Sequence, residues 1–168
     1  MISFPNPVNE VTARVTAGGV VLLALLAIAA QQPWLSIALT VGFFLRVLAG
    51  PKLSPLAILA SRVIVPRLPF APRLVAGPPK RFAQTIGLVF SGAAALLFYA
   101  FSLNTAGYCV LAALVVAAIL ESAFGVCLGC RAFALLMRAG VIPAEVCESC
   151  NDIWAGRPRP TPPPAVSG

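Results

Sequence analysis

The chain has 168 residues, of which 60% are hydrophobic and only 10% are charged, with a formal net charge of +7 and no histidine. A soluble domain carries about a quarter charged residues, so this deficit excludes an ordinary water-soluble globular protein. The missing histidine removes the commonest proton shuttle and metal ligand, which leaves Cys, Glu and Asp for such chemistry.

Four apolar segments predict an all-α integral membrane bundle within residues 1–126, with spans at 11–30, 33–49, 82–103 and 106–124. About 20 helical residues cross a hydrocarbon core of about 30 Å, so the first, third and fourth segments are long enough. The second is short, and we expect Arg46 near its end to extend to the interface. Three spans with a re-entrant second segment, or cleavage of the first segment as a signal peptide, are the alternatives.

The loop at residues 50–81 contains basic residues and no acidic one. The positive-inside rule places this loop and the C-terminal tail in the cytoplasm, and an even number of spans places the N-terminus there too. We expect the loop to contact anionic lipid headgroups, and we expect no nucleic-acid partner. Within it, Ser54-Pro55 predicts the start of a short amphipathic helix on the cytoplasmic leaflet.

Two cysteine pairs follow the last predicted span, in a segment at residues 127–156. Cys127 and Cys130 form the first C-x2-C pair, and Cys147 and Cys150 form the second. This spacing is typical of a four-cysteine zinc site, in which each pair presents two thiolates to one tetrahedral ion; iron uses the same ligands. Because structural disulfides are rare in the reducing cytoplasm, the main alternative is reversible thiol or sulfur-relay chemistry.

Glu121 is the only acidic residue inside a predicted span, which makes it a candidate functional residue. It could assist the cysteine pairs as a proton handler, or it could simply be neutralised by interfacial water or an Arg of the basic loop. No nucleotide fingerprint or catalytic triad is present, which disfavours an enzyme. Residues 157–168 are Pro-rich and predict a disordered tail.

The central stretches Ala49–Leu56, Val65–Arg67 and Pro78–Gln84, together with Gly87 and the pair at Cys127, resemble the bacterial "domain of unknown function 4395" family of small integral membrane proteins. The resemblance implies a bacterial inner-membrane location and assigns no activity. It also implies genes that lie near those of thioredoxin-like or sulfurtransferase proteins, which are candidate partners. We therefore expect a structural zinc site with a scaffold or assembly role, then a thiol–disulfide or sulfur-relay component, and lastly a transporter of a sulfur compound.

Overall fold

The structure, a computed structural model, describes residues 8–69 and 74–143. The predicted disordered tail at 157–168 lies outside these residues. The helices and strands are β1 (Val8–Asn9), α1 (Glu10–Ala29), α2 (Trp34–Ala49), η1 (Gly50–Lys52), α3 (Pro55–Leu59), η2 (Ala60–Ile64), η3 (Val65–Arg67), β2 (Leu74–Val75), α4 (Gly77–Tyr99), α5 (Asn104–Phe124) and α6 (Leu128–Arg138).

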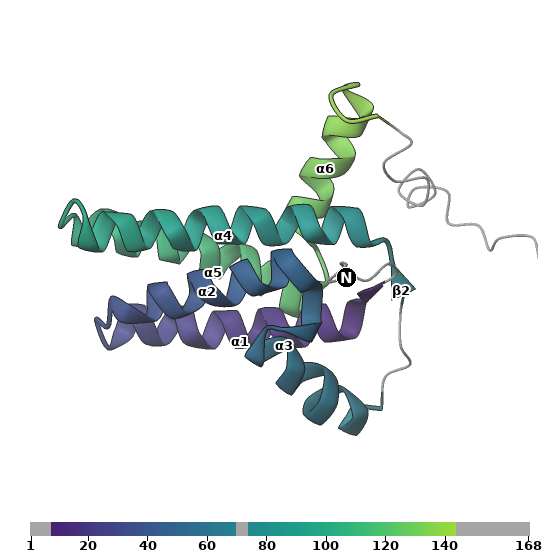
Figure 1. Cartoon of the computed structure of the whole chain (residues 1–168), viewed down its shortest axis with the longest axis horizontal. Helices are drawn as coiled ribbons and strands as arrows, with labels where there is room; N and C mark the ends of the chain where they lie inside the picture. The colour runs from purple at the N-terminus through teal and green to yellow at the C-terminus, as the bar shows by residue number, and fades with distance from the viewer. Residues whose placement is uncertain (1–7, 70–73, 144–168) are drawn as a thin grey trace, which may run out of the picture.

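Four long helices form an antiparallel bundle (Figure 1). α1 packs mainly against α5, and α2 packs mainly against α4, while α4 and α5 join the two pairs. The core between them contains Val20, Leu39 and Leu111, each at most 1% exposed, and the fully buried Ala24 and Ala94. Small residues on α1 and α4 let the helices approach closely, as in other membrane bundles.

The outer surface of the bundle is apolar, in agreement with the prediction of an all-α membrane protein. Among the described residues, three helices are long and apolar enough to cross a membrane: α1, α4 and α5. α2 is apolar but has only 16 residues. Large side chains such as Leu22 (70% exposed) and Val89 (61% exposed) point away from the core, as expected for lipid contact. A fourth span at α2 stays a prediction.

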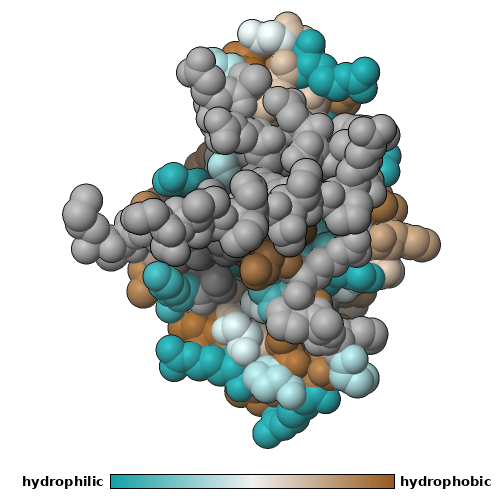
Figure 2. Space-filling view, turned by 90° about the vertical axis from the view of Figure 1, so that its right-hand side faces the viewer, coloured by the Kyte–Doolittle hydropathy of each residue, from teal (hydrophilic) through white to brown (hydrophobic). Residues whose placement is uncertain are grey.

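One end of the bundle carries the remaining helices. The start of α1, the end of α2, the start of α4 and the end of α5 meet there, and α3 and α6 extend away from it on opposite sides (Figure 1). The helix predicted at Pro55 is present as α3 and continues through η2 and η3, with Leu59 50% exposed. Figure 2 looks onto this end and shows hydrophilic residues around its rim, with hydrophobic residues between them.

Two predictions about the charged residues at this end were wrong. α4 begins at Gly77 rather than at residue 82, with Pro78 and Pro79 in its first turn, so Lys80 lies in a helix and not in a loop. Pro favours the first turn of a helix because the N–H that it lacks has no partner there. Arg46 does not extend to the interface: it is 5% exposed and lies inside the bundle.

Candidate functional site

The end of α5 places Glu121 close to the first cysteine pair. α5 ends where Gly125 adopts a left-handed conformation (φ 68°), which a residue with a side chain rarely adopts. Arg14 of α1 donates hydrogen bonds to the carbonyl oxygens of Ser122 (3.2 Å) and Ala123 (2.8 Å), which the helix itself leaves unpaired. The chain then turns directly into α6, which begins after Cys127.

Cys127 is the N-cap of α6. Its sulfur accepts a hydrogen bond from the backbone N–H of Cys130 at 3.4 Å, the role that a Ser or Asp oxygen usually fills. Both cysteines are free thiols; Cys127 is 8% exposed and Cys130 is half-buried. The start of α6 is held against α4 at Gly129, where an added Cβ would lie 2.5 Å from the Cα of Ala83.

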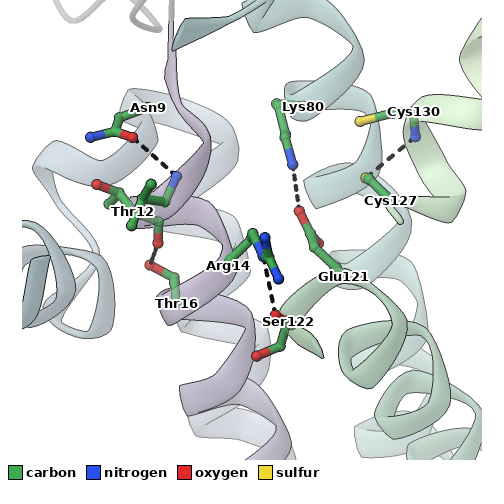
Figure 3. A network of polar contacts seen from close by, with 10 residues as sticks. Asn9, Thr12, Arg14, Thr16, Lys80, Glu121, Ser122, Cys127 and Cys130 are labelled. Atoms are coloured by element: carbon green, nitrogen blue, oxygen red, sulfur yellow. Dashed lines mark hydrogen bonds and ion pairs between the residues drawn. The ribbon is translucent and has the colours of Figure 1, made fainter. Parts of the chain in front are cut away.

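Glu121 forms an ion pair with Lys80, the residue that the sequence placed in the basic loop. Their Nζ and Oε1 atoms are 2.7 Å apart, and the two side chains are 8% and 22% exposed. The pair links α4 to α5 and offsets two charges that would be costly to bury singly. Figure 3 shows it beside Cys127 and Cys130, so the structure brings three predicted site residues together.

The surroundings of the two thiols shift their pKa values in opposite directions. The pKa of Cys127 is lowered, chiefly because the Cys130 thiol donates a hydrogen bond to it and also because Lys80 is near; burial and Glu121 act in the opposite direction. The pKa of Cys130 is raised, chiefly because its proton is held in that hydrogen bond, and then by burial. Of the two thiols, Cys127 is therefore the more readily ionised.

A cavity of about 530 Å³ lies beside this pair, at the same end of the bundle. Its charged lining residues are Arg46, Lys80 and Glu121, and Cys127 also lines it. The rest of the lining is mostly apolar and comes from α1, α2, α4, α5 and α6, including Val20, Phe43, Ile86, Phe90, Ala113, Leu114 and Ala117. A concave, mainly apolar space with a few polar groups is the usual form of a small-molecule site.

The predicted four-cysteine zinc site stays a prediction. Cys147 and Cys150 lie outside the described residues. Within residues 8–69 and 74–143, no group of three or more His, Cys, Asp and Glu is placed to hold a metal. Cys127 and Cys130 can supply two thiolates to a metal, and its remaining ligands would have to come from elsewhere.

Sequence reasoning missed Lys80, Arg46 and Gln84, all of which line the cavity. Lys80 was assigned to the basic loop and Arg46 to the membrane interface, because each lies near the end of an apolar run. The one available signal was Glu121: an acidic residue in a span needs a basic partner, and the nearest helix ends supply Lys80 and Arg46.

Comparison with known proteins gives a family and no nearer relative. No curated protein and no solved structure matched the chain. Residues 8–138 match the profile of a family described as "Domain of unknown function (DUF4395)". This match covers α1 to α6 and includes Lys80, Glu121, Cys127 and Cys130. The chain therefore belongs to the domain of unknown function 4395 family.

Proposed function

We propose that this chain is a membrane thiol–disulfide component in which Cys127 and Cys130 form a redox-active dithiol. The observation that carries the proposal is the position of Cys127, whose sulfur caps α6 and accepts a hydrogen bond from the backbone N–H of Cys130 at 3.4 Å. A thiolate held at a helix N-terminus beside a cation is the usual arrangement of a reactive C-x2-C pair. Lys80 supplies that cation.

The two cysteines have different roles in this proposal. Once the pair is oxidised, the thiolate of a soluble thioredoxin-like partner attacks the more exposed sulfur, that of Cys130. A bond forms between the partner and Cys130, the S–S bond to Cys127 breaks, and Cys127 leaves as a thiolate. The sulfur with the lower pKa leaves faster, which favours this direction of attack. The second thiol of the partner then releases Cys130, and the partner becomes oxidised.

The same proposal places the dithiol at the cytoplasmic face of a bacterial inner membrane. In this arrangement α2 crosses the membrane in addition to α1, α4 and α5, and both termini lie in the cytoplasm. Support comes from the basic residues on η2, η3, α4 and α6, among them Arg62, Arg67, Arg81, Arg131 and Arg138, which belong to the end of the bundle that bears the cysteines. Thioredoxin-like proteins of the cytoplasm would then reach Cys130.

A redox titration of the full-length protein in detergent tests this function. The protein is equilibrated with mixtures of reduced and oxidised glutathione, and free thiols are alkylated and located by mass spectrometry. We expect Cys127 and Cys130 to interconvert as one two-electron couple. Cys127→Ser and Cys130→Ser should each abolish the couple, whereas Cys109→Ser, at an exposed position in α5, should leave it unchanged. A pair that never forms the Cys127–Cys130 disulfide would refute the proposal.

Metal analysis distinguishes the zinc prediction from this function. The protein is purified under reducing conditions, and its zinc content is measured for the native chain and for Cys147→Ser. Near-stoichiometric zinc that is lost in Cys147→Ser would support the four-cysteine site and contradict a free dithiol. A Cys127–Cys130 couple that is unchanged in Cys147→Ser supports the redox function.

A further inference from the structure

The cavity beside Cys127 contains a buried cation with an unused hydrogen-bond donor. Arg46 is 5% exposed, its Nε donates to the carbonyl oxygen of Gly42 at 3.1 Å, and its guanidinium lies 4.4 Å from the centre of the Phe43 ring. Its Nη2 atom is buried and has no hydrogen-bond partner among the described residues. A buried donor without a partner is costly, so this atom points to a ligand oxygen.

A second unused polar atom lines the same cavity. The Oε1 atom of Gln84 on α4 is buried and has no partner among the residues that the structure describes. The lining of the cavity thus offers an unused donor at Arg46 and an unused acceptor at Gln84. A ligand that uses both presents a hydrogen-bond acceptor to Arg46 and, in at least one of its states, a hydrogen-bond donor to Gln84.

The charge and shape of the cavity narrow the class of ligand further. Arg46 and Lys80 together outweigh Glu121 by one positive charge, which favours an electron-rich head group. Deeper in the bundle the lining is apolar. Phe90 of α4 and Ala113 of α5 line the cavity and are exposed, and both helices are long and apolar enough to contact lipid. An uncharged ring with carbonyl oxygens and an apolar tail satisfies all of these conditions.

We propose that the cavity binds a membrane quinone and that the Cys127–Cys130 dithiol reduces it to the quinol. This inference rests on the proposed redox function and names its electron acceptor. The quinone carbonyl accepts a hydrogen bond from Arg46, and the hydroxyl of the quinol donates one to Gln84. Electrons pass from a thioredoxin-like protein through Cys130 and Cys127 to the lipid-soluble carrier.

The reaction needs no oxidant or reductant besides the quinone and the dithiol. The Cys127 thiolate adds to a ring carbon of the quinone, and the electron pair of the ring moves to a quinone oxygen. Cys130 then attacks the sulfur of Cys127, so that the S–S bond forms, the S–C bond breaks and its electron pair stays with the ring. The two quinol oxygens take up the proton of Cys130 and one proton from solvent. Two thiol electrons thereby reduce one quinone, and the dithiol becomes a disulfide.

The test uses the full-length protein in detergent and a ubiquinone with one isoprenoid unit. Quinone reduction is followed by absorbance, and formation of the Cys127–Cys130 disulfide by alkylation. We expect one disulfide per quinone reduced. Arg46→Gln should raise the KM for quinone about 10- to 100-fold, the range for a lost hydrogen bond to a charged donor. Arg62→Gln, at an exposed residue outside the cavity, should leave KM unchanged.

The outcomes separate this inference from the proposed function. A dithiol that exchanges with glutathione but is never oxidised by quinone would refute the quinone site alone. A dithiol that does not exchange with glutathione would refute the proposed function as well. Equal KM values for Arg46→Gln and the native protein would also refute the site. So would a protein from which oleate displaces bound quinone and which does not reduce quinone when oleate is absent. If Arg46→Gln does not fold, Gln84→Leu tests the other contact: inhibition by added quinol should weaken about 2- to 10-fold, the range for a lost hydrogen bond between neutral groups, and unchanged inhibition would refute the site.

Discussion

Replacing Gly129 with Ala tests whether the close contact between α6 and α4 positions the dithiol. The new Cβ would lie 2.5 Å from both the Cα and the Cβ of Ala83. Carbon atoms pack best at about 3.5–4.0 Å, so α6 must move away by about 1 Å. Such overpacking costs about 1–3 kcal/mol of stability. A displacement of about 1 Å at a reacting group can lower a rate about 100-fold.

The assay is the rate at which Cys127 and Cys130 become oxidised by glutathione disulfide, measured together with the Tm in detergent. We expect Gly129→Ala to lower both. Gly92→Ala is the matched control, because its Cβ would lie 3.8 Å from the Cγ2 of Thr40, which is ordinary contact. Adding Ala83→Gly should restore the rate only in part, since the Cα of residue 83 stays in the way. A Gly129→Ala protein with the rate and Tm of the control would show that α6 does not pack closely on α4.

Two other predictions concern the charges around the thiol and the packing of the core. Lys80→Gln should raise the pKa of Cys127 and Glu121→Gln should lower it, so the pH at which iodoacetamide alkylates Cys127 at half its maximal rate should move up and down respectively. Equal shifts in the same direction would contradict this account. Leu111→Ala, at a fully buried position, should cost about 2–5 kcal/mol in denaturation experiments, whereas Leu22→Ala, 70% exposed on the lipid side, should cost far less.

The long apolar helices were predictable because short polar links mark where each one begins and ends. The span predicted at 11–30 coincides with a helix at Glu10–Ala29, and the span predicted at 106–124 coincides with a helix at Asn104–Phe124. The start of α4 was missed by five residues (77 rather than 82) because Lys80 is tolerated inside the helix only through Glu121. That partner lies 41 residues away in the chain, and no local pattern reveals it.

The neighbours of each helix were harder to predict than the helices themselves. Small residues recur four apart on both α4 and α5, and these two helices do pack on each other. The space above Gly87 of α4, however, is filled by Phe43 of α2. On α5, Cys109 and Ala113 are exposed, and Leu111 and Leu114 face the core. Spacing identifies which residues share a face, but the partner of that face depends on the order in which four helices surround one core.

For the cysteine pair, too, local spacing was informative and contacts from distant parts of the chain were not predictable. The spacing of Cys127 and Cys130 was enough to predict paired thiols. The assignment of roles was not, because it depends on the hydrogen bond that Cys127 accepts at the start of α6 and on Lys80 from another helix. Glu121 is conspicuous in the sequence as the only acidic residue inside a predicted span, and the structure has it beside the cysteine pair.

The hydrogen bonds that Arg14 donates to α5 also bear on the order of assembly during synthesis. They join residues 108 and 109 positions apart, so α1 pairs with a helix that is synthesised much later. Until α5 emerges, the face of α1 that it covers is exposed to lipid and Arg14 lacks its carbonyl partners. A nascent chain cut short before residue 104 therefore lacks α5 and cannot complete the four-helix bundle. Quality-control proteases should recognise that incomplete form.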